Sequence, residues 1–214
     1  HEKRWFSSAQ DLRPAEVRIA GNMIRISSEP TLFRTSDGVL FGVEICEDVW
    51  APTPPSNHLA LAGAEIIFNL SASDELTGKH NYLMSLLQQQ SARTITGYVY
   101  ASAGFGESTQ DVVYGGNAII CENGSVIAKG QRFAMSEQLV TAQIDIEKLR
   151  GDRRSNTTFT NAQRRMATEK INIIDMHSAC QRDFVLEREI DPTPFIPKSG
   201  EMKEKCDEIL NIQA

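Results

Sequence analysis

A thiol and two carboxylates stand where a buried strand of this sequence should end. The segment from Gly38 to Ser73 opens with GVLFGVEI, an apolar run that is typical of a buried strand. Cys46, Glu47 and Asp48 follow at once, in place of the Gly, Asn or Pro that usually comes after a strand. Because α/β sheets present nucleophiles and ligands at the carboxyl ends of their strands, Cys46 is a candidate nucleophile for covalent catalysis.

The residues alone leave more than one interpretation of Cys46. Free cysteine is most often a small buried hydrophobe, and Cys46 could be one. As a nucleophile it would need donors for an oxyanion, and the backbone N–H of the next residue, Glu47, could supply one without any role for its side chain. A Cys–His pair with His58, His80 or His177 is a further alternative, although none of these histidines lies in a recognisable protease motif.

The charge and the apolar runs argue against two classes of partner. The formal net charge is −6, whereas binding to nucleic-acid phosphates requires clustered Lys and Arg, so we expect no nucleic-acid partner. No apolar run approaches the roughly 20 residues of a membrane span, so we expect no membrane partner. The opening HEKRWFSSAQDL has no apolar signal-peptide core and no initiator Met, and we expect the chain to be a piece of a longer protein.

Cysteine usage favours a reducing compartment. The chain has four cysteines, widely spaced and without a CxxC pair: Cys46, Cys121, Cys180 and Cys206. This spacing predicts neither a metal site nor a disulfide framework. We therefore expect a cytoplasmic protein.

The elements that position Cys46 are predicted from apolar patterns and turn residues. The strand over 39–45 should pair with an earlier apolar segment across the turn Asp37–Gly38. A short helix capped by Ser56 should end at Gly63, and a second strand should lie within EIIFNLSAS. A helix over 80–96, closed by Gly97, follows.

The second half of the pattern adds strands and hairpins. YVYASAG predicts a third strand, and Asn123-Gly124 predicts a hairpin turn between two β-prone runs. QLVTAQIDI, residues 138–146, predicts a further strand. Alternating strands and helices followed by hairpins indicate an α/β fold with helices on one side of a sheet. DPTPFIPKSG, residues 191–200, predicts a linker into a final helix whose apolar side has little to pack against.

Three stretches together resemble a known family. GVEICEDVWAPTPPS, NLSASDELTGKH and YVYASAGFGESTQDVVYGGNAIICENG are similar to the glutamine-hydrolysing domain of glutamine-dependent NAD synthetases, which belongs to the nitrilase superfamily. The resemblance runs from Glu2 to Ala214, and the combination of CEDVW-x-P-x-PP-S with GESTxD is far more specific than any single short motif. A phosphate-binding loop over Gly104 to Asp111 is a weak alternative, because the glycines are not followed by the required Lys-Ser/Thr.

The resemblance implies a fold and a division of the chain. The fold would be a nitrilase-like αββα sandwich, truncated at its N-terminus, with residues 1–175 as a partial glutaminase domain. Residues 176–214 would be the linker and the start of an absent synthetase domain. Such a truncation would expose an apolar sheet face, which we expect to be buried against another copy in a homo-oligomer.

The resemblance also implies roles for individual residues. Cys46 matches the nucleophile that attacks the side-chain amide of glutamine, releases ammonia and forms a thioester. Ser73 and Lys79 match positions that bind glutamine, and Trp50 would form an apolar wall of the pocket, although a core tryptophan would look identical. Glu2 matches a second active-site carboxylate that orients the substrate.

The family's catalytic triad is matched here only in part. It consists of Glu, Lys and Cys, but the Glu and the Lys lie upstream of the segment that this chain begins with, and Lys3 matches a later position. Glutamine would be the substrate, with no cofactor needed in this chain. Deamido-NAD, ATP and magnesium would belong to the absent synthetase domain.

Two alternatives to a glutaminase remain open. One is a stand-alone carbon-nitrogen hydrolase of the amidase or nitrilase type. The other is a non-catalytic fragment that folds and associates with itself, because a nucleophile without its base and its lysine loses most of its advantage.

Overall fold

A computed structural model describes residues 7–8, 11, 13, 15–166, 170–178, 184–193, 196 and 202–213. The chain divides into two compact units, His1–Asp183 and Phe184–Ala214. The second contains helix α5 (Met202–Gln213), whose described residues are all exposed, as the sequence predicted for this segment. No helix among the described residues has the length and apolar character that crossing a bilayer demands.

The first unit contains both strands and helices. In chain order its elements are β1 (Ala15–Ile19), β2 (Asn22–Ile26), β3 (Thr31–Arg34), β4 (Leu40–Ile45), the 3₁₀ turn η2 (Cys46–Trp50), α1 (Pro55–Leu61), β5 (Ile66–Ser71), α2 (Lys79–Thr94), β6 (Gly97–Ser102), β7 (Ala118–Glu122), β8 (Ser125–Lys129), α3 (Ile146–Ser155), α4 (Thr157–Met166) and β9 (Asn172–Asp175).

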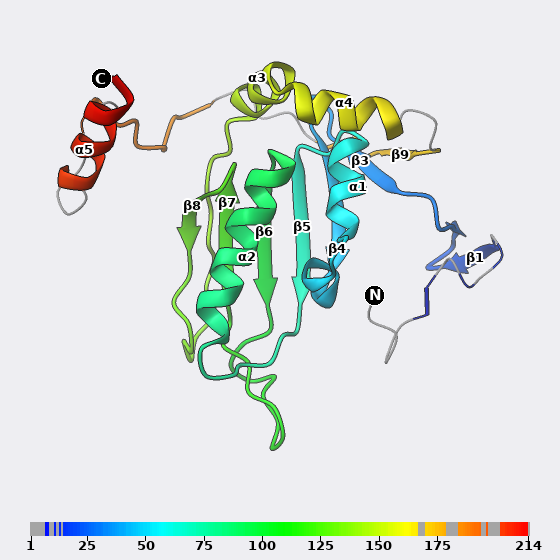
Figure 1. Cartoon of the computed structure of the whole chain (residues 1–214). Helices are drawn as coiled ribbons and strands as arrows, with labels where there is room; N and C mark the ends of the chain where they lie inside the picture. The colour runs from blue at the N-terminus through cyan, green and yellow to red at the C-terminus, as the bar shows by residue number, and fades with distance from the viewer. Residues whose placement is uncertain are drawn as a thin grey trace. The chain divides into compact units, whose positions relative to one another are not determined.

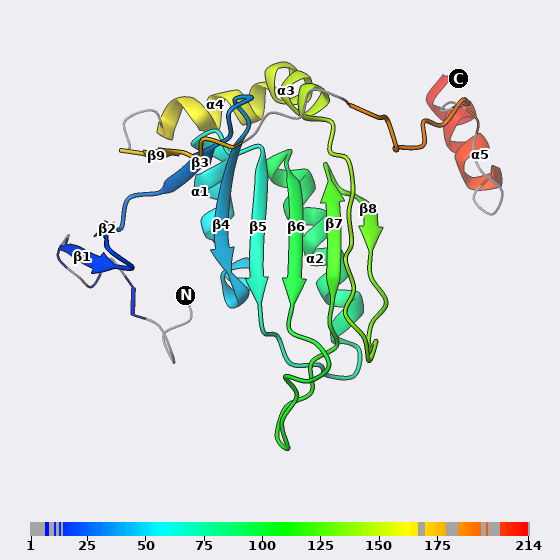
Figure 2. The same cartoon turned by 180° about the vertical axis from the view of Figure 1, so that it is seen from behind.

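A seven-stranded sheet forms the centre of the described part of this unit, in the order β8-β7-β6-β5-β4-β3-β9 (Figure 2). Strands β4, β5 and β6 run parallel, with Ile45 beside Leu70 and Leu70 beside Ala101. The parallel strands therefore end together at one edge of the sheet. The strand β3 is antiparallel to β4, and β7 and β8 form the predicted hairpin at Asn123-Gly124, where both residues have positive φ.

Helices α1 and α2 cover one face of the sheet (Figure 1). The main core lies between them and the strands, where Leu83 and Leu87 of α2 join Ile67, Tyr98 and Ile119, all at most 3% exposed. The face of α2 that the spacing of its leucines predicted to be buried is thus the buried one.

The opposite face of the sheet carries no helix over strands β4 to β7 among the described residues (Figure 2). Val43, Ile45 and Leu70 point to this side and are 38%, 43% and 56% exposed. Phe41 lies between two aromatic partners, Phe33 at 5.2 Å and Phe68 at 5.4 Å. The described residues thus provide one helical layer and one sheet layer, and the predicted apolar open face is present.

Three local predictions were wrong. Ser56 is not the cap of α1: Pro54 holds that position, and the N–H of Ser56 donates to the Glu44 carboxylate at 2.8 Å. Helix α2 ends at Thr94 with Ile95 in the left-handed region, and Gly97 instead begins β6, where a β-carbon would lie 2.6 Å from Ile144.

The predicted strand over 138–146 is also absent. Residues 137–145 form no ladder, and Asp145 ends the segment by capping α3, where its carboxylate accepts from Lys148 N–H at 2.9 Å. Ile144 and Ile146 pack instead against a second core cluster of Ile95, Leu149 and Phe159. The apolar residues that suggested a strand are therefore used to attach α3.

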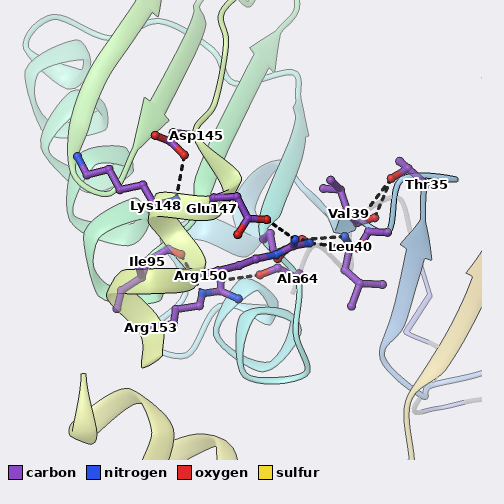
Figure 3. A network of polar contacts seen from close by, with 12 residues as sticks. Thr35, Val39, Leu40, Ala64, Ile95, Asp145, Glu147, Lys148, Arg150 and Arg153 are labelled. Carbon is purple, nitrogen blue, oxygen red and sulfur yellow. Dashed lines mark hydrogen bonds and ion pairs between the residues drawn. The ribbon is translucent and has the colours of Figure 1, made fainter. Parts of the chain in front are cut away.

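Two arginines of α3 join this helix to the strand starts and to the end of α2 (Figure 3). Arg150 forms an ion pair with Glu65, whose carboxylate also accepts from Leu40 N–H at 3.1 Å. Arg153 is 7% exposed and donates to the carbonyls of Ala64 at 2.6 Å, Ile95 at 3.0 Å and Thr94 at 3.2 Å. Burial lowers the pKa of Arg153 to about 10, so the guanidinium is still charged at neutral pH and satisfies the carbonyls that end α2.

We expect Arg153→Ala to lower the free energy of unfolding by about 2–3 kcal/mol, because buried carbonyls lose a charged donor. Urea unfolding followed by circular dichroism measures this change. Arg154→Ala is the matched control, since Arg154 is exposed on the same helix and should change the stability by less than about 0.5 kcal/mol. Equal losses in the two variants would contradict a role for Arg153 in holding α3 to α2.

Candidate active site

Cys46 is the first residue of η2, directly after β4, and its backbone is left-handed with φ +48°. This conformation costs a non-glycine residue about 1 kcal/mol, so the surroundings must hold it. The Asp48 carboxylate accepts from Ile45 N–H at 2.9 Å, and the Asn69 amide donates to the carbonyl of Cys46 at 3.3 Å. The thiol is thereby placed, half-buried, at the edge where the parallel strands end.

Lys79 and Trp50 are brought together beside this turn. The Lys79 ammonium lies 5.6 Å from the centre of the Trp50 ring, and it donates to the carbonyl of Asp74 at 2.7 Å and to its carboxylate at 3.1 Å. Trp50 packs on the core and stacks on Tyr82 with ring centres 5.4 Å apart. Trp50 therefore contacts the core and also presents its ring to a cation, and its role as an apolar wall of a glutamine pocket stays a prediction.

Ser73 follows β5 at the same edge of the sheet. Its N–H donates to the hydroxyl of Ser102, at the end of β6, over 3.3 Å. Beneath them lies Tyr100, 1% exposed, whose hydroxyl has no hydrogen-bond partner of suitable geometry among the described residues. Burial raises the pKa of Tyr100, and the nearby thiol of Cys46 adds to the shift. Ser73 and Ser102 are therefore brought together where β5 and β6 end.

The other candidates take different positions. Glu47 follows Cys46 in η2 and is exposed, and the role expected of its backbone N–H stays a prediction. Glu2 lies outside the described residues. His80 contacts the Asn117 side chain at 3.0 Å, and among the described residues neither His58 nor His177 hydrogen-bonds to Cys46. The Cys–His alternative therefore has no hydrogen bond to support it.

A cavity of about 490 Å³ opens at the start of α2. Gly78 and His80, the neighbours of Lys79, are part of its wall. Arg132 also lines the cavity, and its guanidinium donates to the Glu75 carboxylate at 2.8 Å. Among the described residues no cluster of His, Cys, Asp and Glu could hold a metal ion.

Three polar residues below Cys46 were missed from the sequence: Glu44, Asn69 and Tyr98, each at most 2% exposed. The Tyr98 hydroxyl donates to Glu44, and it accepts from the Asn69 amide at 3.3 Å. A signal was present, because Glu in GVEIC and Asn in IIFNLS interrupt apolar strands, and buried polar groups are rare unless they are paired.

The model of the family described as Carbon-nitrogen hydrolase matches residues 2–154, which is more than half of the chain. The chain belongs to the carbon-nitrogen hydrolase family. The matched segment contains the turn at Cys46 and the residues of the candidate site around it, as far as Arg132.

The relatives of this carbon-nitrogen hydrolase confirm the resemblance found in its sequence. A glutamine-dependent NAD(+) synthetase of Mycobacterium tuberculosis is 38% identical over 221 residues, covering 98% of this chain and 32% of the relative. The human glutamine-dependent NAD(+) synthetase is 29% identical over 191 residues, covering 86% of this chain and 27% of the relative. The chain spans about a third of the length of these relatives.

Solved structures confirm the nitrilase-like α/β fold. A glutamine-dependent NAD(+) synthetase from Cytophaga hutchinsonii matches with a TM-score of 0.52 and 24% identity, covering 65% of this chain and 22% of that one. A carbon-nitrogen hydrolase from Helicobacter pylori matches with a TM-score of 0.53 and 20% identity, covering 62% of this chain and 48% of that one. At these identities the likeness concerns the fold alone.

We expect iodoacetamide at pH 8 to label Cys46 at least ten times faster than Cys121. Burial raises the pKa of Cys121 to about 11, so only about one thiol in a thousand is ionised at this pH. Cys121 is also fully buried, whereas Cys46 is partly exposed. Mass spectrometry of tryptic peptides measures both rates, and labelling in guanidinium should make them similar. Equal rates in the folded protein would contradict the described burial of Cys121.

Proposed function

We propose that this chain hydrolyses the side-chain amide of glutamine and that the ammonia serves the amidation of deamido-NAD in the full natural polypeptide. The observation that carries the proposal is the placement of Cys46, partly exposed in a left-handed turn at the edge where the parallel strands end. A cysteine that only fills space in the core would need neither a left-handed turn nor exposure to solvent. The names of the relatives support glutamine and NAD synthesis as the context.

The proposed reaction has two steps. The sulfur of Cys46 attacks the amide carbon and the carbon-nitrogen bond breaks. The nitrogen takes up the proton of the thiol and leaves as ammonia, which gives a glutamyl thioester. Water then attacks the thioester carbon, which releases glutamate and restores the thiol. The backbone N–H of Glu47 would donate to the oxyanion of both steps. The general base and the oxyanion lysine implied by the family have no matching residue in this sequence, so we propose that activity requires residues beyond it.

Lys79 and Asp74 would bind the amino-acid end of glutamine. A zwitterion carries one carboxylate and one ammonium group, and this pair offers an ammonium and a carboxylate side by side, with side chains 22% and 45% exposed. The face of Trp50 would contact the apolar methylene groups between the two ends of the substrate. Ser73 would add a hydroxyl from the opposite side of the site, and Glu2 is proposed to orient the amide.

The remaining parts of the proposal concern the whole protein. Glutamine hydrolysis through a thioester needs no cofactor, and ATP with magnesium would serve only the synthetase reaction. The exposed apolar face around Val43 and Leu70 supports the expectation that this sheet is covered in an assembly, for which we propose a homo-oligomer. A cytoplasmic location stays a prediction from the cysteines.

Replacing the nucleophile tests the reaction itself. In the full natural polypeptide, Cys46→Ala should lower glutamine hydrolysis at least about 1,000-fold, because no other group can form the thioester. NAD formation from added ammonium should be unchanged, which shows that the protein is folded. Cys206→Ala, on the exposed face of α5, is the matched control and should hydrolyse glutamine normally. Continued glutamine hydrolysis by Cys46→Ala would refute the proposal.

The binding role of Lys79 has a separate test. Lys79→Gln should raise the KM for glutamine about tenfold or more and change kcat less, because the lost ion pair binds ground state and transition state alike. Steady-state kinetics of glutamate release measures both constants. Lys129→Gln, at an exposed position of β8, should leave them as they are. An unchanged KM in Lys79→Gln would remove this residue from the substrate site.

A further inference from the structure

A chain of buried hydrogen bonds runs from the core to the backbone of Cys46. Its members are Glu44 on β4, Asn69 on β5 and Tyr98 on β6, which are 2%, 0% and 0% exposed. Polar groups this deep in a sheet core are costly unless every donor and acceptor is used. A side chain of similar volume without polar atoms would serve packing equally well, so packing does not account for these three residue types.

The directions of the hydrogen bonds are determined by chemistry. Glu44 can only accept when ionised, and it accepts from the Tyr98 hydroxyl. The same oxygen of Tyr98 accepts from Nδ2 of Asn69 at 3.3 Å, and Nδ2 also donates to the carbonyl of Cys46 at 3.3 Å. Both hydrogens of the Asn69 amide are therefore used, and its Oδ1 accepts from the Ser71 hydroxyl at 2.6 Å. The amide has one orientation that satisfies all these partners.

The far end of the chain is anchored in both covering helices. The second oxygen of the Glu44 carboxylate accepts from the N–H of Ser56, in the first turn of α1, at 2.8 Å. The hydroxyl of Ser56 accepts from Gln90 of α2 at 2.9 Å, and both residues are buried. Glu44 is thereby fixed by two hydrogen bonds, one from a strand side chain and one from a helix backbone.

We propose that Asn69 is a positioning residue of the nucleophile, which holds Cys46 in its left-handed turn through the carbonyl hydrogen bond, and that Tyr98 and Glu44 hold Asn69 in the orientation this requires. The inference rests on the proposed function, since it concerns the reaction of Cys46. It extends that function to three residues that contact neither glutamine nor the sulfur.

The geometry explains why Asn69 acts on this carbonyl. Asn69 lies beside Glu44 in the parallel register of β4 and β5, two residues before the strands reach the turn. Cys46 is the residue at the turn with positive φ, and a non-glycine residue leaves this region when nothing holds it. A change in the Cys46 backbone would move the thiol away from the substrate carbon, and small misplacements of reacting groups lower rates strongly.

Asn69→Asp in the full natural polypeptide tests the proposal, because it keeps the shape of the side chain and replaces the donor by an acceptor. We expect kcat for glutamine to fall about 100-fold with the KM within about twofold, since positioning acts on the reacting sulfur and not on binding. Tyr98→Phe keeps the hydrogen bond from Asn69 to Cys46 but removes the hydroxyl that holds the Asn69 amide in place. This variant should lower kcat about fivefold. NAD formation from ammonium should be unchanged in both.

The pH dependence of kcat in Asn69→Asp distinguishes a positioning role of Asn69 from a role in stability alone. A buried aspartic acid has a raised pKa, and its neutral form regains one donor. The ratio of variant to wild-type kcat should therefore rise as the pH is lowered from about 8 to about 6. The titratable groups that face position 69 are Glu44, Tyr98, Tyr100 and Cys46, and they are the same in both proteins, so the ratio removes their effects.

Asn123→Asp is the matched control. Asn123 also loses a side-chain hydrogen bond, to Asp152 at 3.0 Å, but it lies in the β7–β8 turn, away from the site. This variant should lower the unfolding temperature and leave kcat unchanged. If Asn69→Asp keeps wild-type kcat, or if its ratio does not change with pH, the proposal is overturned. If Asn69→Asp does not fold, Tyr98→Phe decides, and an unchanged kcat there overturns the proposal.

Failure of this proposal differs from failure of the proposed function. If Cys46→Ala still hydrolyses glutamine, the proposed function is wrong. If Cys46→Ala is inactive while Asn69→Asp and Tyr98→Phe both have normal kcat, only the positioning role is wrong.

Discussion

The parallel pairing of β4, β5 and β6 is the constraint on which the rest of the described site depends. Parallel strands in register must all turn at the same edge of the sheet, so the residues that follow them are neighbours although they are far apart in sequence. Ser73 and Ser102 meet for this reason, and Cys46 follows the adjacent strand at the same edge. The same register places Asn69 beside Glu44, and so the buried polar chain reaches the backbone of Cys46 from the neighbouring strand.

The two faces of the sheet are chemically different, and the difference follows from what covers them. The face toward α1 and α2 can contain polar groups because those helices supply partners, such as the N–H of Ser56 and the amide of Gln90. The other face is apolar around Phe41, and it is only partly covered among the described residues. A face of that composition requires a further layer, as the nitrilase-like sandwich provides.

The two ends of the parallel strands serve different purposes. At their starts, the buried charged groups are paired: Glu65 with the partly exposed Arg150, and Arg153 with three carbonyls (Figure 3). At their ends, polar groups are left accessible, as in the pair of Lys79 and Asp74. Rigid packing at one end and accessible groups at the other are what a site built on a sheet edge requires, because a mobile support would not keep Cys46 in a strained conformation.

The sequence by itself predicts the elements whose signals are local. The apolar run before Cys46, the Asn123-Gly124 hairpin and the leucine spacing of α2 each predicted an element that the structure contains, and the motif around Cys46 predicted the family. The strand predicted over 138–146 is absent, because the β-prone residues of this segment pack against Leu149 and Phe159 instead of pairing with a strand. Alternating apolar residues indicate burial, but they do not reveal which partner buries them.

Only the tertiary structure decided which polar residues act together. Glu44, Asn69 and Tyr98 are separated by as many as 54 positions in sequence, and no local segment indicates that they contact one another. Their hydrogen bonds exist because three strands align in one register and two helices cover that face. Residue types and local turns are properties of short segments, whereas the direction and partner of a buried hydrogen bond depend on how distant segments pack, and that information is distributed over the whole chain.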